Sequence, residues 1–167
     1  MLQLENPFWT FSLDVYARPG VADECLGLQA RHGIDVNALL FCAWAGAVRA
    51  VALGEQQVVA IGERTTMWQQ QIVLPLRGVR QTLKGLTQHG DPVTSLRKDV
   101  AAAELSSEQI EQAMLFANAD TLLAGAGGSL KEVAVSANLV CFLRHNGAAP
   151  VAPPRLGDAA LAFAKGT

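Results

Sequence analysis

Charged side chains are scarce in this chain of 167 residues. Lysine, arginine, aspartate and glutamate make up 17% of it, and the net charge is −2. A nucleic-acid-binding domain usually carries a basic overall charge or a basic stripe, so we expect no nucleic-acid partner. Cysteine is also rare, and Cys25, Cys42 and Cys141 are widely spaced. This pattern predicts free thiols in a reducing compartment and gives no close pair for a zinc site.

Long apolar runs are absent as well. The uncharged segment at residues 36–48 spans 13 residues, whereas a membrane-spanning helix needs about 20. The first residues show neither a basic region nor a small-residue cleavage site, so we predict no secretory signal. We therefore expect a cytoplasmic protein that makes no membrane contact.

Recognisable catalytic patterns are missing too. His32, His89 and His145 each lie near a predicted helix end and outside the patterns of zinc hydrolases and di-iron bundles. The glycine-rich stretch at residues 125–129 follows a helix and lacks the lysine of a phosphate-binding loop. Neither the serines nor the cysteines have an arranged base in the sequence. The sequence predicts no catalytic residue, no metal and no cofactor, and it favours a protein that is not an enzyme.

Apolar residues, in contrast, make up half of the chain. They are densest at residues 33–53, where Leu39, Phe41 and Trp44 point in different directions around one predicted helix. A helix that is apolar on all sides belongs at the centre of a bundle. Asp35 precedes this segment and is its predicted N-cap.

Helix-starting and helix-ending signals predict further helices over residues 7–18, 21–31, 64–86, 91–103, 107–123 and 129–143. Pro75 should kink the helix predicted over residues 64–86, and the pair Ser106 and Gln109 matches a capping box. Residues 55–62 fit a strand or a helix; we choose a helix that breaks near Gly62, because no partner strand is evident. The expected buried side of the last helix is Leu130, Val133, Ala137, Val140 and Cys141.

These elements predict an all-α fold: one domain over residues 1–147, with about six to seven helices around a buried central helix. The remaining residues, 148–167, are rich in proline and alanine. We expect them to form a loosely ordered tail with at most one helical turn.

The most suggestive polar cluster is Arg77, Arg80 and Lys84. At about 100° per residue these cations share one sector beside the apolar stripe of their helix. Such a group could hold a phosphate, a carboxylate or the acidic surface of a partner. It could equally be a solvated helix face, or pair with acidic groups of the first two helices.

Further candidate binding residues surround this cluster. Asp35 and Asn37 lie at the N-terminus of the central helix. The others are aromatic or amide side chains on predicted apolar helices: Trp9, Tyr16, Gln29 and Trp68. Polar tips on otherwise apolar helices can line a pocket or satisfy one another.

An ordered series of residues carries a family resemblance. It includes Phe8-Trp9, Tyr16, Pro19-Gly20-Val21, Cys25-Leu26, Leu28-Gln29, Gly33, Asp35-Val36-Asn37, Leu39-Leu40-Phe41, Trp44, Trp68, Val73, Pro75-Leu76-Arg77, Arg80 and Leu83-Lys84. Over residues 7–143 the chain resembles DUF2390, a family of small proteobacterial proteins of unknown function. The resemblance implies no activity, and it points to the same candidate positions.

Three functional hypotheses follow. The first is a helical adaptor that binds another cytoplasmic protein through the basic, aromatic-flanked face. The alternative is a protein or enzyme that binds a small anionic ligand between the central helix and the proline-kinked helix. A homodimer that covers a leftover apolar stripe is the third.

Overall fold

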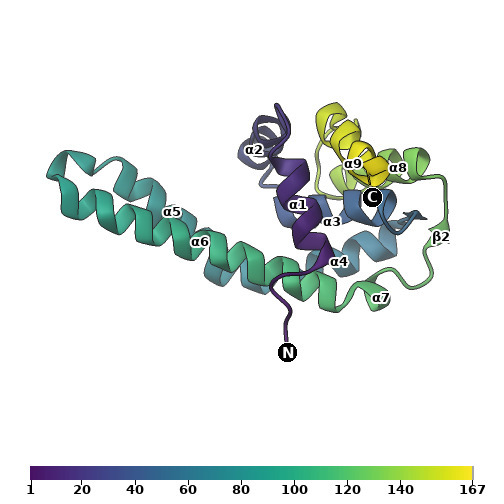
Figure 1. The fold of residues 1–167 in the computed structure, drawn as a ribbon, viewed down its shortest axis with the longest axis horizontal. Helices are drawn as coiled ribbons and strands as arrows, with labels where there is room; N and C mark the ends of the chain where they lie inside the picture. The colour runs from purple at the N-terminus through teal and green to yellow at the C-terminus, as the bar shows by residue number, and fades with distance from the viewer. Residues whose placement is uncertain (167) are drawn as a thin grey trace.

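The computed structural model describes residues 1–166, and most of these are helical (Figure 1). The prediction of an all-α fold is confirmed. The elements in chain order are α1 (Pro7–Tyr16), α2 (Val21–His32), α3 (Val36–Ala47), β1 (Val51–Ala52), α4 (Glu55–Trp68), a π-helical turn (Gln69–Val73), α5 (Leu74–Lys84), a 3-10 turn (Thr87–His89), α6 (Asp91–Ala117), α7 (Ala119–Leu122), β2 (Gly127–Gly128), α8 (Lys131–His145) and α9 (Pro154–Gly166).

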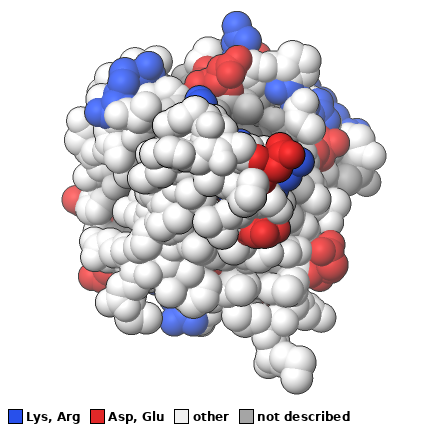
Figure 2. Space-filling view, turned by 90° about the vertical axis from the view of Figure 1, so that its left-hand side faces the viewer, with Lys and Arg blue, Asp and Glu red and all other residues white. Residues whose placement is uncertain are grey.

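A helical hairpin projects from the bundle. We call α5 together with residues 91–104 of α6 the arm; it extends to the left in Figure 1. Viewed from its tip, the surface is largely uncharged, with scattered charged side chains (Figure 2). The predicted break at Ser106 is wrong, because α6 runs unbroken through it for 27 residues. The alanines at 101–103 favour helix, so the Ser106–Gln109 pair has no chain end to cap.

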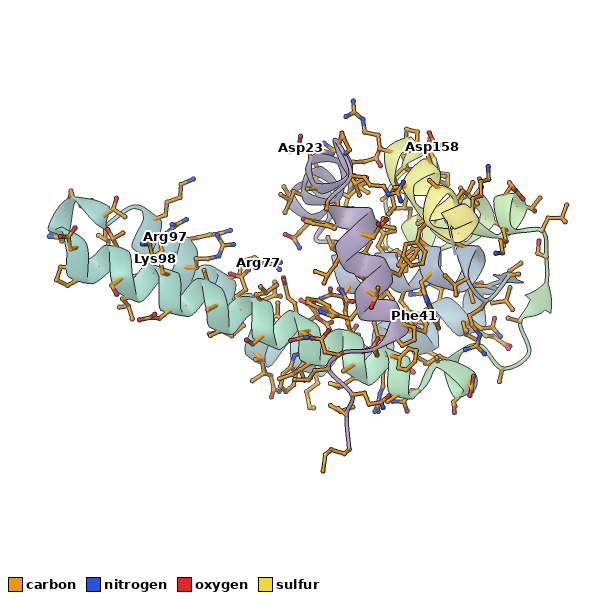
Figure 3. All side chains as sticks on the ribbon, viewed as in Figure 1. Asp23, Phe41, Arg77, Arg97, Lys98 and Asp158 are labelled. Atoms are coloured by element: carbon orange, nitrogen blue, oxygen red, sulfur yellow. The ribbon has the colours of Figure 1, made fainter. Side chains whose placement is uncertain are left out.

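Helix α3 is the centre of the bundle, as the sequence predicts. Every residue from Asn37 to Ala47 is buried, and Phe41 lies in the middle of the body in Figure 3. Its ring meets Phe8 of α1 edge-on, with the centroids 5.2 Å apart. The predicted N-cap is present: Asp35 Oδ1 accepts from the backbone N–H groups of Asn37 at 2.9 Å and Ala38 at 3.2 Å.

Helix α8 packs along α3 at close range. A Cβ on Gly46 would lie only 2.6 Å from the backbone nitrogen of Val135. The predicted buried side of this helix is wrong: Leu130 and Val133 are exposed, whereas Asn138 and Leu139 are fully buried. The Asn138 amide explains the rotation, because it donates to the carbonyls of residues 42 and 51 and accepts from the N–H of residue 53.

Residues 55–62 are helical, as predicted, but α4 continues through Gly62. A short strand does occur just before this region. Val51 and Ala52 pair antiparallel with Gly128 and Gly127, forming a two-residue ladder. Among the described residues, no helix combines the length and apolarity needed to cross a bilayer.

The tail differs from the loosely ordered segment that we expect. Helix α9 covers 13 residues and buries Leu156, Ala159 and Ala160. These residues are spaced i, i+3, i+4, which gives one apolar stripe along a helix. The ring of Phe163 meets Phe11 of α1 at 5.2 Å, so α9 is part of the bundle.

The close approach at Gly46 gives a stability prediction. Gly46→Ala should lower the free energy of unfolding by about 1–3 kcal/mol, because the new methyl group must push the α8 backbone away. Urea unfolding of the purified protein measures this. The matched control is Gly78→Ala on α5, which meets nothing within 4 Å and should stabilise by up to about 1 kcal/mol. Equal effects at both sites would contradict the packing argument.

Candidate ligand-binding site

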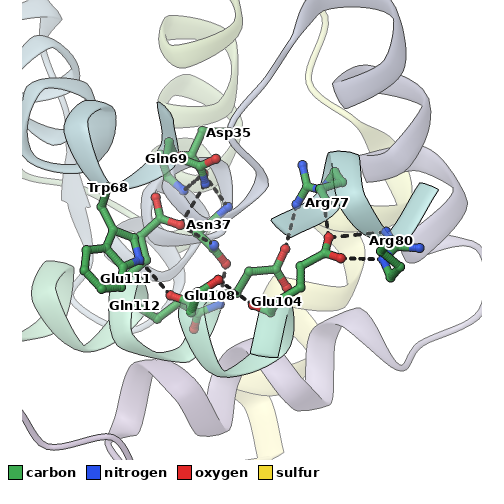
Figure 4. A network of polar contacts seen from close by, with 12 residues as sticks. Asp35, Asn37, Trp68, Gln69, Arg77, Arg80, Glu104, Glu108, Glu111 and Gln112 are labelled. Carbon is green, nitrogen blue, oxygen red and sulfur yellow. Dashed lines mark hydrogen bonds and ion pairs between the residues drawn. The ribbon is translucent and has the colours of Figure 1, made fainter. Parts of the chain in front are cut away.

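Both arginines of the predicted cluster are held by glutamates of α6 (Figure 4). Arg77 donates through Nε to Glu104 at 2.9 Å and through Nη2 to Glu108 at 2.7 Å. Arg80 forms two further hydrogen bonds to the same Glu104 carboxylate. The partners expected from the sequence, Asp14, Asp23 and Glu24, are not the ones used. The reason is the unbroken α6, which brings Glu104 and Glu108 alongside α5.

These ion pairs are largely shielded from solvent. The side chains of Arg77 and Glu104 are 14% and 7% exposed. Burial raises the pKa of the Glu104 carboxyl, but hydrogen bonds from Arg80 and Arg77 outweigh it and hold the pKa below its usual value. Burial raises the pKa of Glu108 above its usual value, against the opposing charge of Arg77. Two guanidinium groups and two carboxylates thus form a cluster with no net charge.

A pocket of about 280 Å³ opens beside this cluster, between α1, α2, α3, α5 and α6. Its buried lining residues are Trp9, Ser12, Asn37, Leu40, Glu104 and Gln112. The rim is exposed and includes Leu13, Leu26 and Leu105. Six of the residues predicted from the sequence line it: Trp9, Tyr16, Gln29, Asn37, Arg77 and Arg80.

Two buried polar atoms of the pocket lining have no hydrogen-bond partner in the protein. They are the hydroxyl of Ser12 and the Oε1 oxygen of Gln112. Both residues are only 3% exposed. A buried polar atom without a partner costs roughly 1–3 kcal/mol. An acceptor and a hydroxyl without partners therefore lie buried in the wall of the pocket.

Behind the pocket, a polar network joins α3 to α4 and α6. Asn37 donates to Glu111 at 2.8 Å and accepts from Gln112 at 2.8 Å. Gln69 donates to Glu111 at 2.7 Å and to the capping residue Asp35 at 3.1 Å. Asp35 is therefore both the cap of α3 and a member of this network.

The π-helical turn before Pro75 supplies Gln69 to the network. Pro75 lacks an N–H group and cannot complete the regular hydrogen-bond ladder of a helix. Where the sequence predicts a kink, the chain forms a π-turn at Gln69–Val73 and then continues as α5. Such turns often lie at functional sites, and here the turn directs Gln69 toward Asp35 and Glu111.

Glu111 is fully buried, and its Oε1 oxygen has no partner in the protein. Burial raises the pKa of Glu111 to about 9, and the nearby Asp35 carboxylate adds to this effect. Hydrogen bonds from Asn37 and Gln69 act in the opposite direction. Glu111 is therefore a neutral acid at pH 7. A proton on this side chain avoids two negative charges in one buried site.

The other predicted candidates lie outside the pocket. Trp68 donates through Nε1 to the carbonyl of Ser107 at 2.9 Å and so fixes the π-turn to α6. Lys84 is exposed in the last turn of α5. Asp35 faces a second, wider cleft of about 890 Å³, which shares Leu26, Gln29 and Arg77 with the pocket.

Sequence reasoning missed the acidic residues and Gln112. Glu104, Glu108 and Glu111 are spaced i, i+4, i+7, which places them on one face of a continuous helix. That signal disappears when a helix break is placed between residues 103 and 107. The carboxylates of α6 could therefore have been found only with the correct helix boundaries.

The pocket offers no obvious nucleophile. Burial raises the pKa of the Cys25 thiol to about 12, so it stays protonated and unreactive. Tyr16 behaves in the same way, because burial raises the pKa of its hydroxyl to about 12. Within the described part of the chain, no group of three or more His, Cys, Asp or Glu side chains is placed to hold a metal ion.

Fold and site together define an all-helical bundle with a lateral pocket where the arm meets the body. The chain belongs to the DUF2390 family, described as a protein of unknown function, whose pattern matches residues 7–115. This range covers α1 to nearly the end of α6 and includes every residue of the pocket lining. No curated protein and no solved structure matches the chain.

The buried acid gives a pH prediction. Between the ordinary glutamate pKa and about 9, folded Glu111 holds a proton that the unfolded chain has released. Stability should therefore fall as pH rises through this window. Glu111→Gln should reduce the decrease in the free energy of unfolding by on the order of 1 kcal/mol per pH unit. Urea unfolding at several pH values between 5 and 9 measures this. The exposed Glu132→Gln should keep the wild-type slope; an unchanged slope in Glu111→Gln would show that Glu111 ionises normally.

The buried ion pairs give a second prediction. Arg77→Glu should lower the free energy of unfolding by roughly 3–5 kcal/mol, because it leaves Glu104 and Glu108 beside a third carboxylate. Arg18→Glu breaks the exposed pair with Asp14 and should cost about 1 kcal/mol or less. Thermal or urea unfolding compares the two variants. If Arg77→Glu were no more damaging than Arg18→Glu, the guanidinium group would be free for a partner.

Proposed function

We propose that this protein binds a small, electrically neutral and mainly apolar molecule that carries an N–H or O–H donor. The observation that supports this most directly is the pair of buried, unpartnered groups in the pocket lining, Ser12 Oγ and Gln112 Oε1. A ligand donor that reached Gln112 would relieve the cost of its buried oxygen. Trp9 and Leu40 supply the apolar wall.

The charge balance favours a neutral ligand over the anion that we expect from the sequence alone. Arg77 and Arg80 already bind Glu104 and Glu108. An anion would have to displace a carboxylate from its guanidinium partner and leave that carboxylate buried. A neutral ligand needs no such displacement, and it can still contact the apolar stems of both arginines.

The volume restricts the size of the ligand. The pocket volume of about 280 Å³ lies just below the range for small-molecule sites, roughly 300–1,000 Å³. The pocket therefore suits one or two fused rings or a short branched chain. We assign binding to this pocket and no chemical step.

The adaptor hypothesis receives less support in its original form. It requires a basic face that is free to meet an acidic partner, but two of the three cations are held by glutamates of α6. Lys84 remains exposed on this face. One lysine gives little charge complementarity to a partner surface.

Indole tests the proposed ligand class, because it is neutral, mainly apolar and carries one N–H donor. Titrated into isotope-labelled protein, it should cause saturable NMR shifts at Trp9, Asn37 and the Gln112 side-chain amide. Benzoate, which has a similar ring and a negative charge, should bind more weakly. Stronger binding of benzoate would favour an anion site, and the absence of saturable shifts with indole would overturn the proposal.

Ser12→Ala tests the unpartnered hydroxyl. It removes no hydrogen bond within the protein, so stability should be retained. Loss of one ligand hydrogen bond should weaken indole binding roughly three- to ten-fold. Ser136→Ala, at an exposed position on α8, is the control and should bind indole like the wild type. Unchanged affinity in Ser12→Ala would place the ligand elsewhere.

A further inference from the structure

The side of the arm remote from the pocket carries an apolar row that none of the described residues 1–166 covers. On α5 and just after it, Val79 and Leu86 are 49% and 39% exposed, and on α6 Leu96 is 51% exposed. None of these residues belongs to the hydrophobic core of the bundle, and α5 has no buried residue. Monomeric proteins seldom leave such a continuous apolar row open.

The spacing of this row follows a seven-residue repeat on both helices. On the first helix Leu76 and Leu83 are half-buried, while Val79 and Leu86, also seven apart, are exposed. On α6 Val93 and Val100 are half-buried, and the exposed positions are Leu96 and Ala103. The half-buried positions lie between the two helices of the hairpin. The exposed positions form the outer edge of the same stripe, which a two-helix hairpin alone leaves without a partner.

We infer that a second copy of this chain covers this row, so that two arms form a four-helix bundle. The same face of another copy presents the same repeat, also on two antiparallel helices, which makes the surface self-complementary. A two-fold contact of this kind is closed and stops at a dimer. Four helices are the common solution for two apolar hairpins.

The cations of α5 do not obstruct this contact. Arg77, Arg80 and Lys84 lie roughly 100° or more around α5 from Val79, so two copies would not bring these cations together. In Figure 3, Arg77, Arg97 and Lys98 lie on the side of the arm nearer α2. The pocket is on that side as well, so dimer formation leaves it open and is independent of ligand binding.

The area of this face sets the expected strength of dimerisation. Residues 74–89 extend for about 24 Å and two helices are about 20 Å across, so two copies would bury about 1,000 Å² in total. This is near the lower limit for a specific interface. The protein should therefore show a reversible monomer–dimer equilibrium in the micromolar range.

Sedimentation equilibrium of the full chain over micromolar concentrations tests the inference. Wild-type protein should dimerise, and Val79→Glu and Leu96→Glu should each shift it to monomer. Gln81→Glu introduces the same charge at an exposed position on the opposite side of α5 and should leave the dimer intact. Val79→Ala and Leu96→Ala should weaken association without adding a charge, and circular dichroism checks the fold of every variant.

Three results would overturn the inference. Wild-type protein that stays monomeric at the highest concentration would show that a second copy does not cover the row. A dimer that survives both Val79→Glu and Leu96→Glu would use another surface. Equal dissociation by Gln81→Glu would show a general effect of charge and no specific interface.

Discussion

The burial of α3 on all sides is the constraint on which the rest of the structure depends. An uncharged helix can be covered only by several others, and α1, α4, α6, α8 and α9 all pack against it. Its glycine at position 46 admits the backbone of α8, and its aromatic residues meet α1. Because α3 has no exposed side, polar chemistry is confined to its N-terminus, where Asp35 and Asn37 are the first hydrophilic groups.

That polar end of α3 is where the arm joins the body. Asn37 and Asp35 form hydrogen bonds with Glu111 and Gln69. Arg77 and Arg80 bind Glu104, which precedes Glu111 by about two turns of α6. A buried polar network is costly unless its members are satisfied. Among the buried atoms that stay without a partner, those on Ser12 and Gln112 belong to residues that line the pocket, and the proposed ligand site rests on them.

The two faces of the arm differ in chemical character. One face carries the arginine–glutamate cluster and one wall of the pocket. The other carries the apolar repeat of Val79, Leu86 and Leu96. A pocket and a self-association surface on opposite sides of one hairpin can work independently, because neither uses the side chains of the other.

Local signals in the sequence determined much of the architecture. The uncharged stretch after Asp35 identified the central helix, and the side chain of Asp35 caps α3 as predicted. Six of the nine candidate site residues line one pocket. These features depend on periodicity and capping, which act within a few residues of the chain.

Only the tertiary structure decided the partners and the helix ends that depend on distant contacts. Whether α6 continues past Ser106 determines which carboxylates reach Arg77 and Arg80. The rotation of α8 is set by Asn138, a polar residue buried because three backbone groups from α3 and the β1 region meet it there. The tail becomes helix because the body offers Phe11 and neighbouring apolar groups to cover its stripe. Such contacts join residues far apart in the chain, so local patterns carry little information about them.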